Sequence, residues 1–526
     1  MPKKTFIRPL INFKGVNELI TPGINAPYTG DSQDIGGVTI PFTRDARNVW
    51  FRDGQVHDRD GVVKLGGSSA ADSAIDGLFP YTLIGDTRYL IRITTTAVAQ
   101  YNETSNVWTN ITGTALTGTS NTLVDATVID DTFIFTNGKD KPRKWAGTGN
   151  TAVIASDGAS VWGKTVVAFQ GFLMFGNWSS DGTTFDKGIE IIYADDWDTA
   201  ASWEPCNTNI IVVAETPGEI LKMGVLDRSL MVYKRDGVVK LTFNPGSSSF
   251  RHELMPFDMG ILAPNSLVTI NRVGHIFMAR DKQLYLNDGQ TIRPVPRHVA
   301  EELRIRTIDA YVKFSCAAND YTKTTYTLLY PKTAASTWLD GRIDYNYVSG
   351  EFSKGDYQEA VRKFHRLAAF DFTDASTVRS TLVATDDNKL VYRLDSGQND
   401  ETTVPTRYYT SDWTNLGFVG DKYLRGGVFV FNRIPGGRVR ISVAQDYQEQ
   451  FRYAQTFSLS GLDVTSDDVV IRYELTSLLG NEFNFKLEFF RDVSTAANVF
   501  KSAYLRFTPL SEDTRELQPM AQTRSA

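Results

Sequence analysis

Residues Gly158 to Thr165 read GASVWGKT and match the phosphate-loop pattern G-x-x-x-x-G-K-[ST]. In nucleotide-binding proteins this pattern joins a buried strand to a helix, because loop N–H groups and the helix N-terminus bind the phosphates. Thr151–Ala155 could supply the strand. Thr165–Gly176, however, is β-branched and aromatic with Gly171 in its middle, which predicts a strand, a turn and a second strand. Trp162 is also bulky for a phosphate loop. We therefore interpret GASVWGKT as a connection between strands.

A second short pattern suggests glycan chemistry. Ser179–Phe185, SSDGTTF, resembles the S-x-D-x-G-x-T-[WF] turn of sialidase-like propellers. It is one residue short and occurs once, whereas such an enzyme would carry several copies, an arginine cluster, and a tyrosine with acidic partners. We interpret the segment as an ordinary Asp-Gly turn.

Other residues able to do chemistry are sparse. The histidines are His57, His252, His275, His298 and His365, and no two stand at the i, i+2 or i, i+4 spacing of a metal site. No G-x-S-x-G motif occurs, and sequence alone cannot measure the carboxylate separation that glycoside hydrolysis requires. The sequence therefore assigns no catalytic, cofactor-binding or metal-binding residue and predicts a protein that is not an enzyme.

The only two cysteines, Cys206 and Cys316, lie far apart with no His or Cys at metal-ligand spacing near either. We expect two buried free thiols, with a disulfide as the alternative.

Composition limits the class of protein. The many Tyr, Phe, Trp, Thr and Val residues favour strands over helices, and the many Gly and Pro residues supply turns. The net charge of −6 excludes a basic protein that wraps nucleic acid tightly. The sequence has neither a run of 18 apolar residues nor an N-terminal signal-peptide pattern. We therefore expect synthesis in a cytoplasm and no membrane span.

A repeated unit sets the expected architecture. An apolar strand, a tight turn and a second strand recur about every 45 residues, as four-stranded propeller blades do. The repeats are centred near Tyr101, Trp145, Ile192, Leu241, Leu286, Tyr345 and Tyr392. Residues 76–404 are therefore predicted to form a β-propeller of about seven blades, with six or eight as alternatives. Stacked sandwiches are the competing interpretation.

The chain ends differ from the repeats. Residues 1–75 are expected to form an extended arm and a β-hairpin with its turn at Asp53-Gly54. Residues 405–510 are predicted to form a β-sandwich, because Arg438–Val443 and Phe483–Phe489 alternate as half-buried strands do. Residues 511–526 are expected to be a flexible tail. The best helix candidates are the segments 294–307 and 356–367.

Two stretches resemble a known family. Ala46–Gly67, ARNVWFRDGQVHDRDGVVKLGG, has an Ala-Arg-Asn-Val opening, an Arg-x-Gly turn and an Arg-x-Gly-Val close. LVYRLDSGQND is later followed by SDWTNLG and KYLRGGVFVF. Both are similar to tail hub proteins of short-tailed bacteriophages, a family that includes tail tubular or nozzle proteins and packaged-DNA stabilisation proteins. The resemblance is best over residues 46–67 and 389–446 and weaker over most of the rest.

The resemblance implies a structural role in the virion tail. The family would form a homo-oligomeric ring, expected to be a hexamer, below the portal and its adaptor. Double-stranded DNA would pass through it transiently and without sequence specificity. Further partners would be tail fibre or spike proteins and the tail tip or needle. The alternative is a propeller-type depolymerase that degrades glycans from a phage particle.

Overall fold

The computed structural model describes residues 6–10, 15–16, 42–43 and 45–510, except for a set of short segments. These segments are 67–70, 72, 120–121, 158–159, 207–208, 248, 296, 333–337, 358–363, 375–376, 387, 401–403, 412, 414–419, 461–466 and 492–496. The expected tail at 511–526 lies outside the described residues. The chain divides into two compact units: one contains residues 62–342 and 361–395, and the other contains residues 1–61, 343–360 and 396–526.

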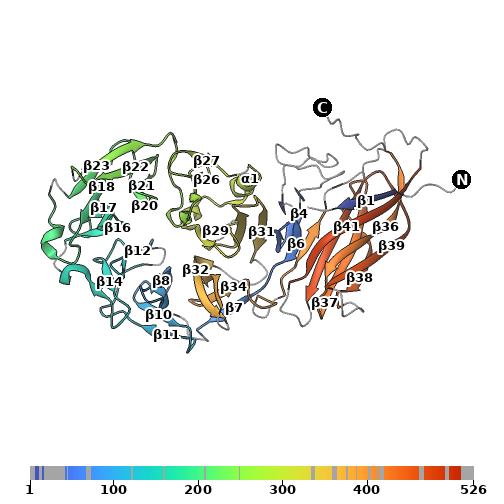
Figure 1. Cartoon of the computed structure of the whole chain (residues 1–526), viewed down its shortest axis with the longest axis horizontal. Helices are drawn as coiled ribbons and strands as arrows, with labels where there is room; N and C mark the ends of the chain where they lie inside the picture. The colour runs from blue at the N-terminus through green and yellow to red at the C-terminus, as the bar shows by residue number, and fades with distance from the viewer. Residues whose placement is uncertain are drawn as a thin grey trace. The chain divides into compact units, whose positions relative to one another are not determined.

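The first unit consists of antiparallel four-stranded sheets that follow one another along the chain (Figure 1). Blade 1 contains β8 (Ile75–Thr82), β9 (Arg88–Thr94), β10 (Val98–Asn102) and β11 (Val107–Asn110). Blade 2 contains β12 (Asp125–Ile129), β13 (Thr132–Thr136), β14 (Arg143–Trp145) and β15 (Ala152–Val153). Blade 3 contains β16 (Trp162–Phe169), β17 (Phe172–Ser179), β18 (Lys187–Ala194) and β19 (Ile210–Val212).

Four further sheets continue the series. Blade 4 contains β20 (Ile220–Leu226), β21 (Ser229–Lys234), β22 (Val238–Asn244) and β23 (Ser249–Leu254). Blade 5 contains β24 (Val268–Ile270), β25 (Gly274–Met278), β26 (Leu284–Asn287) and β27 (Ile292–Pro294). Blade 6 begins with β28 (Cys316–Asp320), β29 (Thr325–Tyr330) and β30 (Gly341–Asn346). The boundary between the two compact units falls inside β30, after Arg342. Blade 7 contains β32 (Phe364–Asp374), β33 (Thr377–Asp386), β34 (Val391–Leu394) and β7 (Val62–Leu65).

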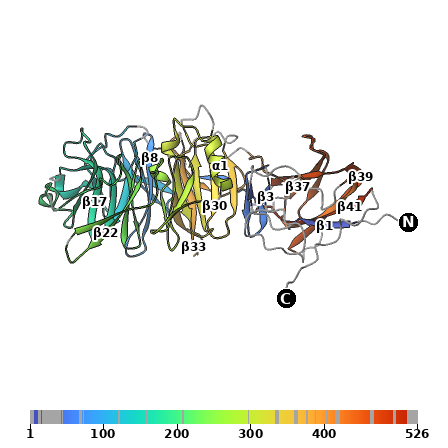
Figure 2. The same cartoon turned by 90° about the horizontal axis from the view of Figure 1, so that it is seen from above.

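The first strand of each blade is the innermost one. Strands β8, β12, β16, β20, β24, β28 and β32 each contact the next, and β32 contacts β8, so the ring closes after seven blades. Figure 2 shows the same sheets after a 90° turn of the view. The chain is therefore a β-propeller, as the repeat predicts, and stacked sandwiches are excluded. The second strands carry unbroken apolar runs, such as Leu173–Phe175, because neighbouring blades cover both of their faces.

Strand β7 closes the ring. It pairs antiparallel with β34, so that Val62 lies opposite Leu394 and Leu65 opposite Val391. Leu65 then packs in a core cluster that also contains Leu90 of blade 1. The expected boundary at residue 75 is wrong here, because β7 belongs to the last blade and not to an N-terminal hairpin.

The second unit contains a sandwich of two sheets, as predicted for the C-terminal region. One sheet has the order β39-β36-β41-β6-β5, with β1 also paired to β41, and the other has the order β38-β37-β40-β35-β4. Phe429 and Phe485, one from each sheet, pack with ring centroids 5.9 Å apart. These strands are β1 (Phe6–Leu10), β4 (Asp45–Arg47), β5 (Val49–Arg52), β6 (Gln55–Asp58), β35 (Tyr408–Thr410), β36 (Lys422–Asn432), β37 (Gly437–Gln445), β38 (Arg452–Ser458), β39 (Asp468–Gly480), β40 (Phe483–Arg491) and β41 (Val499–Pro509).

The N-terminal hairpin is confirmed, since β5 pairs with β6 around Asp53-Gly54. It is not a separate arm, however, because β6 pairs with β41 and β4 pairs with β35 inside the sandwich. The same unit contains β2 (Gly15–Val16), which pairs in parallel with β3 (Phe42–Thr43) and β31 (Phe352–Asp356).

One of the two predicted helices is present. Helix α1 (Arg297–Arg306) lies within 294–307. The prediction for 356–367 is wrong at both ends, because β31 ends at Asp356 and Phe364–Leu367 begin β32, where burial outweighs the helical pattern. Short 3-10 turns occur at Ile154–Asp157, Ala200–Trp203, Pro264–Ser266 and Val312–Phe314. Across the described ranges, no helix is long and apolar enough to span a membrane.

Candidate functional site

The described part of the phosphate-loop pattern lacks the strand-to-helix setting of a phosphate loop, while Gly158 and Ala159 lie outside the described residues. Trp162–Thr165 begin the innermost strand β16 of blade 3, and a turn at 170–171 and strand β17 follow, as predicted from the composition. The Lys164 ammonium lies 3.2 Å from the Glu219 carboxylate, and the Thr165 hydroxyl donates to the buried Asp125 carboxylate. The second half of the pattern thus lies within a strand, where we had expected a connection.

The sialidase-like pattern is an Asp-Gly turn, as interpreted. The Asp181 carboxylate accepts hydrogen bonds from the Thr183 and Thr184 N–H groups, both at 2.8 Å, and from the Ser179 hydroxyl at 2.7 Å. These bonds hold the pKa of Asp181 well below its usual range. Because three donors converge on this carboxylate, its role is to shape the turn between β17 and β18.

The cysteines are both free, but only one matches the expected burial. Cys316 is buried, and the cost of burying a thiolate raises the pKa of its thiol to about 12. Cys206 is exposed on the loop before β19 and so corrects the expectation of a second buried thiol. No group of three or more His, Cys, Asp or Glu side chains that could hold a metal ion occurs among the residues whose placement is described.

One histidine belongs to a buried network that connects blades 4 and 5. His275 Nδ1 lies 2.9 Å from the Tyr233 hydroxyl, and His275 Nε2 lies 3.0 Å from the Val225 carbonyl oxygen. Asn287 donates to the same tyrosine oxygen at 2.9 Å. Burial lowers the pKa of His275 to about 4 and raises that of Tyr233 well above its usual range. The sequence did not indicate this network, because His275 has no motif around it.

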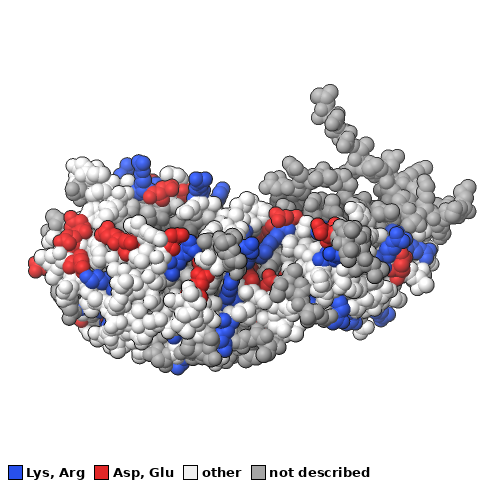
Figure 3. All heavy atoms as spheres, turned by 60° about the horizontal axis from the view of Figure 1, so that its bottom comes forward, with Lys and Arg blue, Asp and Glu red and all other residues white. Residues whose placement is uncertain are grey.

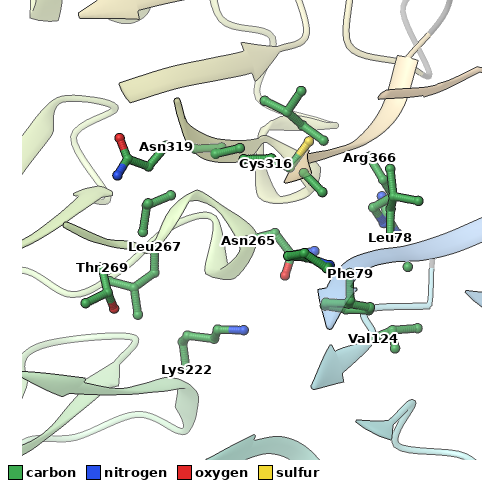
Figure 4. Close-up of a pocket in the computed structure, with 18 of the residues that line it drawn as sticks. Leu78, Phe79, Val124, Lys222, Asn265, Leu267, Thr269, Cys316, Asn319 and Arg366 are labelled. Carbon is green, nitrogen blue, oxygen red and sulfur yellow. The ribbon is translucent and has the colours of Figure 1, made fainter. Parts of the chain in front are cut away.

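A candidate ligand site is a cavity of about 370 Å³ inside the ring of innermost strands (Figure 4). Strands β8, β20, β24, β28 and β32 all contribute to its wall. Phe79, Val124 and Leu267 form part of the apolar lining. Sequence reasoning missed this site, because its lining is spread from Asp76 to Ala369.

The charges at this cavity are matched locally. The Lys222 ammonium pairs with the Asp125 carboxylate, which also accepts from the Val166 N–H at 3.0 Å. The Arg366 guanidinium donates to the carbonyl oxygens of Asp76, His365 and Thr122. One of its nitrogens also lies 3.9 Å from the Asp76 carboxylate. Each cation at the cavity therefore has an anion beside it.

One end of the propeller carries mainly acidic side chains. Because the strands of a blade alternate in direction, the turns after the first and third strands all lie at one end of the ring. Among the described residues of these turns, the exposed charged side chains are Asp86, Asp130, Asp195, Asp196, Asp198, Glu204, Asp227 and Asp288 against Arg228 and Arg272. This set is called the acidic end. The face in Figure 3 shows acidic and basic side chains interspersed.

The segment that carries the family resemblance builds a buried junction in the second unit. Asp58 and Arg491 form an ion pair in which both side chains are 0% exposed, and Arg59 pairs with Asp400 at 2.6 Å. Gly61 donates its N–H to the Gly397 carbonyl oxygen at 2.9 Å. A Cβ at Gly61 would lie 2.0 Å from the backbone oxygen of Asn399, in the segment that passes beside Gly61, so only glycine fits.

The LDSG phrase also has a structural role. Within the propeller unit, Asp395 accepts two hydrogen bonds from the Arg342 guanidinium, at 2.7 and 2.9 Å. Lys323 lies 3.0 Å from the same carboxylate. This buried group fastens the end of β34 in blade 7 to blade 6.

Comparisons with known proteins give the fold and no family. No family model and no curated protein matches the sequence. Among solved structures, the Pan2 WD40 domain of Neurospora crassa is similar at 10% identity, with 64% of this chain and 96% of that chain covered and a TM-score of 0.37. BBS1N in complex with ARL6DN is similar at 9% identity, with the same coverages and a TM-score of 0.38. Because these scores are low, the propeller assignment rests on the strand order and the closed ring.

Proposed function

We propose that this chain is a structural, non-enzymatic subunit of the tail of a short-tailed bacteriophage. It would form a hub or nozzle ring, expected to contain six copies, below the portal and its adaptor. The ring would close and guide the DNA exit channel and anchor the tail fibre or spike and the tail tip or needle. The subunit would be made in the host cytoplasm and end up in the virion.

The observation that carries this proposal concerns the residues of the resemblance. Arg59 and Gly61, from the Arg-x-Gly-Val phrase, contact Asp400 and Gly397, which belong to the LDSGQND stretch. Two phrases that are far apart in the sequence thus build one buried junction. Members of a family that share an organisation are expected to share the residues of such a buried junction. Turns that resemble the family by chance would not be expected to contact each other.

The charge distribution also supports a DNA exit role. A channel that releases DNA quickly must avoid rows of phosphate-neutralising Lys and Arg, since each such contact adds a salt-sensitive attraction. The net charge of −6 and the acidic end provide little such attraction. We expect the isolated chain to bind duplex DNA weakly, and modest salt should abolish the binding. Tight, salt-resistant binding would contradict the proposed role.

The decisive experiment is an electron-microscopy map of the phage particle whose genome encodes this chain. The proposal requires the chain to be built into a symmetric axial ring between the portal–adaptor complex and the tail tip. Finding it in the capsid shell, at a fibre tip or as a monomer with no axial channel would refute it. Degradation of capsular polysaccharide by the purified chain would instead favour the depolymerase alternative.

A further inference from the structure

Four aromatic side chains form a patch at the acidic end of the propeller, where blades 3 and 4 meet (Figure 1). Phe172 follows the turn after β16, Tyr193 and Phe243 lie next to the ends of β18 and β22, and Phe250 lies in β23. The centroids of neighbouring rings are between 5.2 and 5.4 Å apart. Each ring packs on the core between the two blades and keeps part of its surface exposed. These four residues are called the aromatic patch.

Acidic side chains border the aromatic patch. Asp195 and Asp196 follow Tyr193 at the start of the loop that connects β18 to β19, and both are exposed. Burial and the nearby Cys206 and Asp195 raise the pKa of Tyr193, as expected if Asp195 lies beside the patch. Neither aspartate makes an ion pair with any residue in the described part of the chain. Aromatic rings inside a charged rim are typical of a protein–protein interface.

The sandwich has an exposed apolar patch on the outer face of one sheet. Val430 lies opposite Val470 of β39, and Val428 lies opposite Tyr504 of β41. Val470 is 60% exposed and Tyr504 is 42% exposed, so this part of the sheet is open to solvent. These four residues are called the valine patch. A contiguous exposed group of this kind marks a surface for another protein better than single exposed residues do.

Basic side chains border the valine patch. Lys501 and Arg506 on β41 pair with carboxylates of β39, both at 2.5 Å. Arg472 lies opposite Val428, and Arg425 lies at the bulge of β36. Neither Arg472 nor Arg425 makes an ion pair within the ranges that the structure describes. The valine patch therefore has two guanidinium groups without a carboxylate, whereas the aromatic patch has two carboxylates without a cation.

We propose that the aromatic patch of one copy binds the valine patch of the next copy, and that this head-to-tail contact builds the ring of the proposed hub. The aromatic rings pack against Val470 and Tyr504, and Asp195 and Asp196 face the guanidinium groups beside them. Two unlike surfaces on one chain make a heterologous contact, which closes into a ring when the rotation between copies allows it. The contact rests on the proposed hub role, since a ring of several copies needs such a pair of surfaces on every copy.

Exchange of the charges tests the contact in the full chain. One variant carries Asp195→Arg and Asp196→Arg, and the other carries Arg425→Glu and Arg472→Glu. Sedimentation velocity at low salt should show wild-type oligomers, whereas each variant alone brings like charges together and should associate at least about tenfold more weakly. An equimolar mixture restores opposite charges at every contact and should form assemblies with equal numbers of the two variants, which native mass spectrometry can count. The variant that combines all four substitutions should assemble as the wild type does.

Matched controls separate this contact from general charge and stability effects. Asp186 and Asp258 are exposed in the connections after the second strand of blade 3 and the fourth strand of blade 4, at the other end of the propeller. Asp186→Arg with Asp258→Arg makes the same charge change there and should leave assembly unchanged. Val470→Ser should weaken association roughly tenfold. Val404→Ser changes an equally exposed valine outside the patch and should have no effect.

Three results would each overturn the contact: a wild type that stays monomeric at low salt, charge variants that assemble as the wild type does, or a mixture that stays monomeric. If a double variant fails to fold by circular dichroism, the exchange of Asp196→Arg with Arg472→Glu applies the same test. An electron-microscopy ring whose copies meet through other surfaces would refute the contact and leave the hub role intact. Assembly that follows the charge exchange in a chain absent from the tail would refute the hub role alone.

Discussion

His275 should make the propeller sensitive to acid. The side chain is 0% exposed, and its hydrogen bonds suit the neutral ring: Nε2–H donates to the Val225 carbonyl, and Nδ1 accepts from the Tyr233 hydroxyl. A proton on Nδ1 would leave that hydroxyl hydrogen without its acceptor. Burial therefore lowers the pKa of His275 from 6.5 to about 4. The unfolded chain binds the proton more readily, so this contribution to stability is complete above pH 6.5 and is lost as the pH falls to about 4.

The magnitude follows from the shift. A pKa lowered from 6.5 to about 4 corresponds to about 3 kcal/mol of unfolding free energy, most of it lost by pH 4.5. His275→Gln removes the titrating ring and keeps hydrogen-bonding groups. We expect the wild type to lose about 2.5 kcal/mol more than this variant between pH 7.5 and pH 4.5. Urea unfolding read by hydrogen exchange of peptides from β25 reports on this unit separately from the sandwich.

A matched variant separates titration from packing. Tyr233→Phe removes the hydroxyl partner but leaves the buried ring of His275, so it should lower the stability at every pH and keep the acid sensitivity. If His275→Gln and the wild type lose the same stability between pH 7.5 and pH 4.5, then burial of the neutral ring does not set the acid response, and the reasoning fails.

Three further outcomes follow from other contacts. Lys164→Ala should change the unfolding free energy by less than about 1 kcal/mol, because the side chain of Lys164 in its ion pair is 43% exposed. Nucleotide binding that vanishes with this substitution would contradict the assignment of Lys164 to a strand. Leu65→Ala should destabilise the propeller by about 2–5 kcal/mol in urea unfolding, whereas Val63→Ala, on the same strand but 45% exposed, should be nearly neutral. Asp58→Asn should destabilise the sandwich by about 3–5 kcal/mol, because it leaves a buried arginine with less counter-charge, and Asp53→Asn in the exposed hairpin turn is its control.

The propeller was predictable because its signal is local. Each second strand, such as β17 or β21, is covered on both faces and carries an apolar run, and tight turns between strands favour Gly, Asn or Asp. These demands recur in every blade and so leave a period in the sequence. The Asp181 turn was readable for the same reason, since its donors lie within five residues of one another.

The ring closure and the candidate site were not predictable, because their signals are not local. Nothing near Val62 indicates that its partner is Leu394, and a four-residue strand fits a hairpin as well as a blade. The cavity likewise combines ordinary alanines, leucines and asparagines from five innermost strands, none of which carries a motif. Segment 356–367 failed for a related reason: its helical period describes the isolated peptide, whereas Phe364 and Leu367 are buried by contacts in β32.

The chain order couples the completion of both units to the C-terminal half of the sequence. Strands β4 and β6 are made early, yet β4 pairs with β35 and β6 pairs with β41 of the sandwich. Strand β7 is also made early, but the seventh blade is complete only after β34 has been made and has paired with β7. An N-terminal fragment therefore contains neither a closed propeller nor a complete sandwich. Such distant pairing slows folding, because loop closure costs entropy before the contacts form. For a subunit proposed to assemble into a ring, this order has a physical advantage, since only a chain made to its last strands can present finished surfaces to its neighbours.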